Sequence, residues 1–230
     1  MSTPVLQVKK VESGVSAPVL QVKDLRVQYH TDRGTLRAVE GVSFSLRAGE
    51  RMGLVGESGS GKSTMALALM RMIKPPGRIT GGEMLVDGVD LTRLSEEEMR
   101  KARSTLISMI PQGAMNSLNP VMRIGDQIVD TIRAHSQDRS AKGMQVRVSE
   151  ALESVGLQRT VAQMYPHELS GGMKQRVCIA IAVALRPKVI IADEPTSALD
   201  VVVQRQVMKP SGDPRKEWAL ASTWLGIIWG

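Results

Sequence analysis

The fold is decided by one stretch of the chain, Gly56-Glu57-Ser58-Gly59-Ser60-Gly61-Lys62-Ser63. It fits the pattern G-x-x-x-x-G-K-[ST] at every defined position, and it lies between an apolar, strand-like stretch (52–55) and a helix-like stretch (64–72). In such a loop, glycines let the backbone curl so that its N–H groups face a chain of phosphates, and the start of the helix adds a favourable potential. This context favours a phosphate-binding loop over a glycine-rich turn with an incidental Lys-Ser.

The loop therefore predicts a site for a nucleoside triphosphate. Lys62 can reach the β- and γ-phosphates, and the hydroxyl of Ser63 can ligate Mg²⁺. The residues expected to bind the nucleotide at this loop are Gly56, Glu57, Ser58, Gly59, Ser60, Gly61, Lys62, Ser63 and Thr64.

Two adjacent carboxylates, Asp193 and Glu194, follow the apolar run Val189-Ile190-Ile191-Ala192. Asp193 is expected to hold Mg²⁺ through water, and Glu194 to orient and activate an attacking water molecule, which suits catalysis by positioning and electrostatics. A strand that ends at two solvated acids is the alternative. Since the pair follows the phosphate loop by about 130 residues, the sequence favours nucleotide hydrolysis.

Strand-like and helix-like stretches alternate along the chain, which indicates an α/β fold with a mostly parallel sheet. Strands are expected at 24–29, 38–46, 52–55, 82–88 and 189–192, and helices at 64–72, on both sides of Gly143 and after Gly171-Gly172. The first 27 residues contain a near repeat, since Pro4-Val5-Leu6-Gln7-Val8-Lys9 recurs at 18–23. One copy suffices for the strand that follows, so residues 1–16 are expected to be a disordered extension.

Composition excludes some classes of function. Apolar residues make up 42% of the chain, as in ordinary globular proteins, and aromatic residues only 3%. The net charge of +7 suits an anionic ligand, but no basic stripe with stacking aromatics indicates nucleic-acid binding. No stretch approaches the ~20 apolar residues that span a bilayer, and no signal peptide is apparent. Cys178 stands alone in an apolar run and is expected to be a buried, inert thiol.

The segment Leu169-Ser170-Gly171-Gly172-Met173 resembles the signature LSGGQ of ATP-binding subunits of ABC transporters, with Met173 in place of Gln. The segment that follows the acidic pair, Pro195-Thr196-Ser197-Ala198-Leu199-Asp200, resembles the D-loop of that family. The resemblance implies that the signature contacts the γ-phosphate of ATP held by an opposite subunit. It also implies that Gln112 senses the γ-phosphate beside Mg²⁺ and contributes to catalysis, and that Tyr29 stacks on adenine. The implied Mg²⁺ ligands are Ser63, Gln112 and Asp193, and the implied D-loop contacts are Ser197, Ala198, Leu199 and Asp200.

The implied fold is an α/β P-loop NTPase of the ABC type. It has a mostly parallel central sheet, an N-terminal antiparallel β subdomain and an inserted helical subdomain at about 113–176. The ATP-binding domain is expected to span 17–208, and 209–230 to form an aberrant tail.

Two segments, Asn116-Ser117-Leu118-Asn119-Pro120 and Tyr165-Pro166-His167-Glu168, resemble the importer branch for peptides and nickel, although Pro111, Gly113 and Ala114 depart from its pattern. The resemblance implies ATP hydrolysis that powers import of di- or oligopeptides. Its implied partners are membrane permease subunits, a second ATP-binding subunit (identical or different) and, indirectly, an extracytoplasmic solute-binding protein. The implied location is peripheral, on the cytoplasmic face of the inner membrane.

The switch histidine of the family is missing, because His30, His135 and His167 all precede Asp193. Prolines at 210 and 214 interrupt the helix expected there. In the family the switch strand lies between the phosphate-loop strand and the Asp193 strand, and Thr223–Trp229 lies at the right distance in the sequence to occupy that place. An out-of-frame tail and a truly shortened subunit both fit this pattern. Two functional alternatives therefore remain: a subunit that binds ATP but is deficient in hydrolysis, and a soluble ABC ATPase without a transport role.

Overall fold

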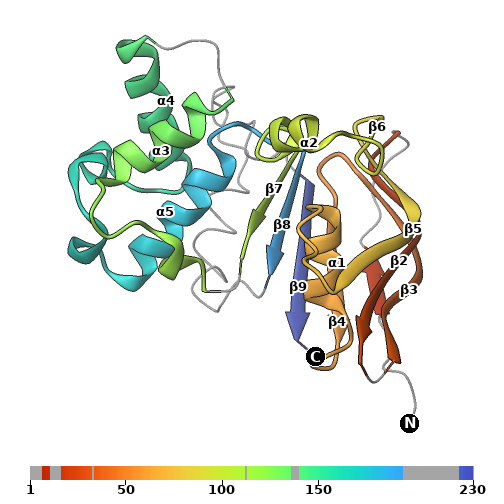
Figure 1. Ribbon diagram of the computed structural model, residues 1–230. Helices are drawn as coiled ribbons and strands as arrows, with labels where there is room; N and C mark the ends of the chain where they lie inside the picture. Colours follow the sequence, from red (N-terminus) through yellow and green to blue (C-terminus); the bar gives the residue numbers. More distant parts are fainter. Residues whose placement is uncertain are drawn as a thin grey trace. The chain divides into compact units, whose positions relative to one another are not determined.

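The computed structural model describes residues 7–10, 17–32, 34–111, 113–135, 140–193 and 223–229. They fall into two compact units, which are considered separately (Figure 1). The sheet unit contains the described residues of Met1–Met109, Lys188–Glu194 and Ser222–Gly230. The helical unit contains those of Ile110–Pro187.

The first sheet of the sheet unit is antiparallel throughout, in the order β3-β2-β5-β6. Its strands are β2 (Pro18–Thr31), β3 (Gly34–Arg47), β5 (Gly77–Val86) and β6 (Val89–Asp90). Along β2, Leu20, Val22, Leu25 and Val27 are buried while their neighbours are more exposed, so the strand has one core face. The expected N-terminal antiparallel sheet is confirmed.

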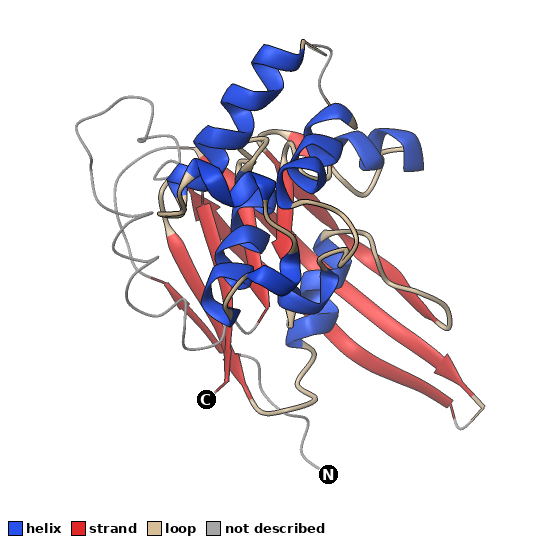
Figure 2. Cartoon of the chain, turned by 90° about the vertical axis from the view of Figure 1, so that its left-hand side faces the viewer, coloured by secondary structure: helices blue, strands red, loops and turns tan. Residues whose placement is uncertain are grey.

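The second sheet has the order β1-β4-β9-β8-β7. Strands are drawn in red in Figure 2. Its strands are β1 (Gln7–Lys10), β4 (Arg51–Gly56), β7 (Ile107–Ile110), β8 (Val189–Asp193) and β9 (Thr223–Trp229). Strand β9 is parallel to β4 on one side and to β8 on the other, with its Gly226 opposite both Gly53 and Ala192. The segment 223–229 thus fills the central position expected for it.

Strand β1 corrects one expectation from the sequence. Residues 7–10 lie in the segment expected to be disordered, yet they pair antiparallel with β4, from Gln7 opposite Val55 to Lys10 opposite Met52. The two copies of the near repeat serve different sheets, because the second copy opens β2. Pairing with β1 satisfies backbone groups on the side of β4 that faces away from β9.

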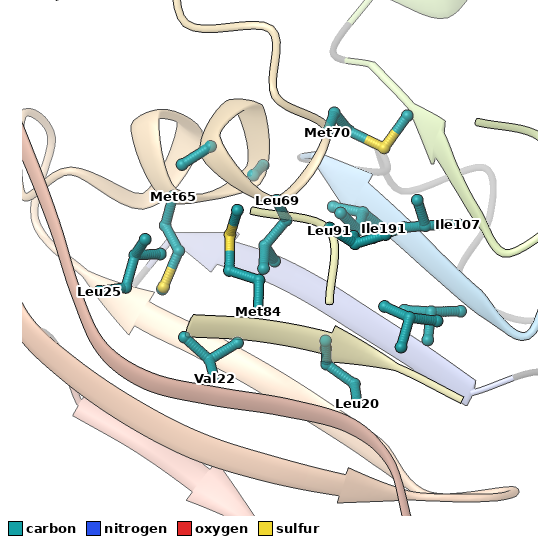
Figure 3. Close-up of a cluster of buried hydrophobic side chains, with 14 of the residues drawn as sticks. Leu20, Val22, Leu25, Met65, Leu69, Met70, Met84, Leu91, Ile107 and Ile191 are labelled. Carbon is teal, nitrogen blue, oxygen red and sulfur yellow. The ribbon is translucent and has the colours of Figure 1, made fainter. Parts of the chain in front are cut away.

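The core of the sheet unit is built from aliphatic and methionine side chains, in keeping with the low aromatic content. Helix α1 (Lys62–Leu69) contributes Met65 and Leu69, which lie among Leu25 and Met84 of the antiparallel sheet and Ile191 of the second sheet (Figure 3). Met65 and Leu69 are fully buried, and each stabilises the fold by about 1.5–3 kcal/mol. The helix that follows the phosphate loop is thereby fixed to both sheets. Helix α2 (Glu96–Ala102) begins at a Ser95–Glu98 capping box.

The helical unit contains three α-helices, α3 (Ile124–Arg133), α4 (Ala141–Ser154) and α5 (Gly171–Val183), among its described residues. Short 3₁₀ helices lie at Ala114–Ser117, Arg159–Gln163 and Pro166–Glu168. Gly143 was expected to separate two helices but lies within α4, because the Ser140 hydroxyl caps the helix by accepting from the Gly143 N–H. The unit begins at Ile110 and runs to Pro187, wider than the expected 113–176.

Candidate functional site

The loop 56–63 joins the end of β4 to the start of α1 and needs glycine at two positions. Gly59 and Gly61 have φ of +79° and +91°, a backbone region that glycine adopts without steric cost. At Gly61 a Cβ atom would also lie 2.2 Å from the carbonyl oxygen of Ala38, on β3. Strand β3 therefore presses directly against the start of α1, and only glycine fits there.

The ammonium of Lys62 lies inside the curl of the loop. Its Nζ donates to the carbonyl oxygens of Gly56 (2.6 Å) and Glu57 (2.7 Å) and to Oγ of Ser60 (3.2 Å). The side chain is only 3% exposed. The loop thus holds a positive charge at the point where its backbone curves, which is the charge that a phosphate chain requires.

The hydroxyl of Ser63 donates to Oδ1 of Asp193 over 3.2 Å. This contact joins the phosphate loop to the end of β8, between residues that lie 130 positions apart in the sequence. Burial raises the pKa of the Asp193 carboxyl, and the Ser63 hydrogen bond and the nearby Lys62 charge oppose that rise. A hydroxyl and a carboxylate side by side are hard oxygen ligands of the kind that Mg²⁺ takes from proteins, the rest being waters and phosphates.

A pocket of about 490 Å³ opens beside the loop, within the sheet unit. Its lining comes from the loop and the first turn of α1 on one side and from β2 and β3 on the other. The lining residues are Tyr29, Leu36, Arg37, Ala38, Val39, Glu40, Val42, Gly59, Ser60, Gly61, Lys62, Ser63, Thr64 and Met65. Gly56, Glu57 and Ser58 belong to the same loop but do not line the pocket.

Tyr29 lies on β2 and is half-buried. Its ring rests against the backbone of Gly77, since a Cβ atom at that glycine would lie 2.6 Å from Cε1 of the tyrosine. The residue therefore packs against β5 and also lines the pocket. This position suits the expected stacking on adenine, which stays a prediction.

The signature segment lies at the start of α5, in the helical unit. Ser170 caps the helix, its Oγ accepting from the N–H of Met173 over 3.3 Å, while Leu169 is buried. Ser170, Gly171 and Gly172 are exposed, and a Cβ atom at Gly172 would meet nothing within 4 Å. Packing within the unit does not require a glycine at 172, so the helix start is open to contact from outside.

The two importer-type segments also lie in the helical unit. The Gln127 side chain accepts from the N–H of Asn119 and donates to the carbonyl oxygens of Asn119 and Met122, all within 3.1 Å. The Arg123 guanidinium lies 5.1 Å from the ring centre of Tyr165. Side-chain hydrogen bonds and cation–π contact hold these loops in place.

Several expected residues lie outside the described part of the chain or of its side chains. Gln112, Glu194 and the D-loop residues Ser197, Ala198, Leu199 and Asp200 are among them. The structure also brings β3 residues to the pocket that sequence reasoning missed, namely Leu36, Arg37, Ala38, Val39, Glu40 and Val42. The alternating pattern from Ala38 onward predicted a strand, but only the close approach of Ala38 to Gly61 and the pocket lining show that this strand faces the loop.

Cys178 is buried, as expected, and burial raises the pKa of its thiol to about 11. Within the described residues, no helix has both the length and the apolar character to span a membrane. The same residues contain no cluster of three or more His, Cys, Asp or Glu side chains suited to a metal.

Comparison with known proteins points in one direction. Residues 39–197 match the family model described as ABC transporter. The chain is 47% identical over 205 residues to the oligopeptide transport ATP-binding protein OppD of Escherichia coli (strain K12), covering 88% of this chain and 60% of that protein. It is 45% identical over 192 residues to the dipeptide transport ATP-binding protein DppD of Lactococcus lactis subsp. cremoris, covering 83% of this chain and 55% of that protein.

Solved structures agree with the sequence relatives. The chain superposes on an ATP-binding cassette, MJ0796, in a dimeric post-hydrolysis state bound to ADP and Pi, with a TM-score of 0.73 and 28% identity. The match covers 91% of this chain and 87% of that one. Against the OppD and DppD relatives named above, the chain spans about 55–60% of their length.

Proposed function

Because the chain belongs to the ABC transporter family, we propose that it is an ATP-binding, ATP-hydrolysing subunit that powers a membrane importer of di- or oligopeptides. The names of its OppD and DppD relatives support the solute class. ATP binding is supported best by the 3.2 Å hydrogen bond between Ser63 and Asp193, beside the ammonium of Lys62. This hydrogen bond joins a residue of the phosphate loop to Asp193, which a separate sequence motif predicted to hold Mg²⁺.

The phosphates are bound by the loop and by Lys62. In the ligand-free chain, Lys62 donates to two carbonyl oxygens and a hydroxyl of its own loop. When a triphosphate enters, those neutral acceptors are exchanged for anionic phosphate oxygens, so that Coulomb attraction to the ammonium adds to its hydrogen bonds. The loop glycines let the backbone amides approach the same phosphates.

Mg²⁺ would be held by Ser63 and Asp193, with Gln112 as a further ligand, and would neutralise charge on the phosphate oxygens when bound. Burial of Asp193 favours a cation there, since a nearby positive charge relieves the cost of the buried carboxylate. Glu194 would orient the attacking water and accept its proton. The signature residues Leu169, Ser170, Gly171, Gly172 and Met173, with the D-loop residues 197–200, would complete the site of a second ATP-binding subunit.

One test separates ATP binding from overall folding. Replacing Lys62 by alanine is expected to lower the affinity for ATP at least tenfold, about 1.4 kcal/mol, measured by titration calorimetry on the intact chain. Lys23→Ala is the matched control, because Lys23 forms an exposed ion pair with Glu83 on β5, away from the pocket. Unchanged ATP affinity in Lys62→Ala would rule out the assigned site.

Dimerisation gives a second test. Glu194→Gln, with ATP and Mg²⁺, is expected to shift the chain toward a dimer, because binding persists while water activation is lost. Adding Ser170→Arg should abolish the shift, since the exposed helix start would then carry a bulky cation. A chain that stays monomeric in light scattering under all these conditions would contradict a shared site in this chain.

A second candidate function is ATP binding with little turnover. Strand β9 occupies the place between β4 and β8, and its sequence Thr-Trp-Leu-Gly-Ile-Ile-Trp contains no histidine. Steady-state ATPase assays with and without permease subunits distinguish the two functions. A rate that the permease stimulates supports the powered importer. ATP binding with no rate above background supports the second candidate.

The membrane partners are proposed on the same grounds. Permease subunits would hold this subunit peripherally at the cytoplasmic face of the membrane, and a solute-binding protein would choose the transported solute. Reconstitution with the permease in lipid vesicles tests the solute class. ATP-dependent uptake of a labelled dipeptide or oligopeptide is expected, and ATP-dependent uptake of nickel without peptide uptake would overturn the peptide assignment.

A further inference from the structure

The C-terminal end of α1 is held by a guanidinium from outside the helix. Helix α1 ends at Leu69, with Met70 as its C-cap, and its own last turn contains no basic residue. Carbonyl oxygens at a helix end lack partners within the helix. Arg103, the C-cap of α2, supplies them: its Nε donates to the carbonyl oxygen of Met70 over 3.0 Å and its Nη2 to that of Arg71 over 3.1 Å. A cation with two donors therefore closes the negative end of the helix dipole.

Arg71 joins the same end of α1 to a second segment. Its φ is +49°, an uncommon value for a residue other than glycine. While its carbonyl oxygen accepts from Arg103, its own guanidinium donates to the carbonyl oxygens of Leu91 and Leu94, in the segment that leads into α2. The end of α1 is thus tied to the chain both before and after α2.

The guanidinium of Arg103 is itself held in one orientation. Its Nη1 pairs with Oε1 of Glu96, in the first turn of α2, over 2.9 Å. The Arg103 side chain is only 22% exposed, although arginine is mostly exposed in proteins. Arg103 is not among the residues that line the phosphate-loop pocket. Its effect on a ligand in that pocket must therefore pass through α1.

Helix α1 presents its ligand-binding groups at the opposite end, because Lys62 and Ser63 form its first turn. The helix is about 12 Å long. Burial of Met65 and Leu69 fixes which face of the helix is turned to the core. Apolar contact is non-directional, so it resists a small shift along the helix axis less than hydrogen bonds do, whose strength depends on distance and angle. The hydrogen bonds from Arg103 therefore act on the axial position of the phosphate-binding end.

We propose that Arg103 is a positioning residue of the nucleotide site. By holding the carbonyl oxygens of Met70 and Arg71, it fixes α1 along its axis, so that Lys62 and Ser63 stand where the phosphates bind. This inference rests on the proposed function, because it requires a phosphate ligand at the loop. Since the first turn of α1 binds phosphates rather than a base, loss of Arg103 weakens the binding of ATP and of inorganic tripolyphosphate by the same factor.

Titration calorimetry on the intact chain, with ATP and with inorganic tripolyphosphate, each with Mg²⁺, tests the proposal. Arg103→Ala is expected to lower both affinities about fivefold, because two charge-assisted hydrogen bonds to the end of α1 are lost. Arg103→Lys keeps the charge but not the planar fork, and should recover part of both affinities. Arg100→Ala is the matched control and should bind like the parent chain, because Arg100 lies on the same helix in an exposed ion pair with Glu97.

A second control separates positioning from a general loss of stability. Leu46 is fully buried near the end of β3, beyond the residues of that strand that line the pocket. Leu46→Ala should lower the midpoint of urea unfolding at least as far as Arg103→Ala does, because it leaves a cavity. Both of its affinities should nevertheless equal those of the parent chain. All affinities are compared in buffer in which the urea curves show each variant to be folded.

Three results overturn the inference: unchanged affinities in Arg103→Ala, a loss confined to ATP, or an equal loss of affinity in Leu46→Ala. If Arg103→Ala does not fold, Arg103→Lys decides, and parent-like affinities in that variant reject the positioning role. Failure of the proposed function looks different, because Lys62→Ala then leaves the binding of both ligands unchanged. A normal effect of Lys62→Ala with no effect of Arg103→Ala rejects only the role of Arg103.

Discussion

Replacing Gly61 by alanine should destabilise the protein more than the same change at Gly59. Both glycines lie in the phosphate loop and both have positive φ, +91° and +79°. A Cβ atom at Gly59 would meet nothing within 4 Å, whereas one at Gly61 would lie 2.2 Å from the Ala38 carbonyl oxygen. The pair therefore separates backbone strain from steric overlap.

The expected magnitudes follow from these geometries. Alanine in left-handed backbone costs about 1–2 kcal/mol, and this applies to both positions. At Gly61 the overlap forces the loop or β3 to move by roughly 1 Å, and overpacking of this kind costs about 1–3 kcal/mol more. Gly61→Ala should thus lower the free energy of unfolding by about 2–5 kcal/mol, and Gly59→Ala by about 1–2 kcal/mol.

Urea unfolding followed by circular dichroism measures both losses on the intact chain. With an m-value of about 2 kcal/mol/M, the midpoints of the two variants should differ by about 1 M. Calorimetry should show a larger loss of ATP affinity for Gly61→Ala as well, because the loop must leave its position beside β3. Equal midpoints and equal affinities would refute the claim that the approach of Ala38 requires glycine at 61.

Two titratable groups give further predictions. Asp193→Asn should stabilise the ligand-free chain at pH 7: burial raises the pKa of the carboxyl in the folded state, so stability falls as pH rises through the ordinary carboxyl range. In urea unfolding this gain should vanish near pH 3, while calorimetry shows weaker Mg²⁺-dependent ATP binding; a loss of stability at pH 7 would contradict the burial argument. Cys178→Ala should flatten the pH dependence of stability between about 9 and 11, because the thiol pKa is raised from 9.0 to about 11 and the unfolded chain ionises first. Across that pH window the free energy of unfolding of the parent chain should fall by about 2–3 kcal/mol relative to that of the variant. Equal pH dependence of unfolding in the two chains would contradict the raised thiol pKa.

The phosphate loop was predictable because its chemistry is local. Glycine spacing, the position of Lys62 and the flanking strand and helix are all contiguous in the sequence, and together they predicted the strand–loop–helix unit that the structure contains. The contact of Ser63 with Asp193 could be anticipated from two motifs, although the hydrogen bond itself needed the folded sheet.

The β3 wall of the pocket was not predictable. Leu36 opposes Tyr29 only because of a register that includes a bulge between Val27 and Gln28, and alternation of apolar residues does not specify register between strands. The error at Gly143 has a local cause. Glycine is a poor helix former, but the Ser140 cap and the buried face of Met144, Val148 and Ala151 outweigh that cost.

The error at residues 7–10 has a different cause. The repeated hexapeptide suggested that one copy was not needed for the fold. Strand β4, however, has two edges that need a partner strand, and residues 7–10, which overlap the first copy, pair with one of those edges.

The place of β9 also bears on the order in which the protein can fold. Its partners on β4 precede it by about 170 residues, so the strand that separates β4 from β8 emerges from the ribosome long after the phosphate loop. Pairings of such long range are slow to form, because the intervening chain loses entropy before any contact is gained. Until β9 inserts, the inner edges of β4 and β8 present unpaired backbone groups that other chains can bind. The nascent chain should therefore depend on chaperones until synthesis reaches this strand.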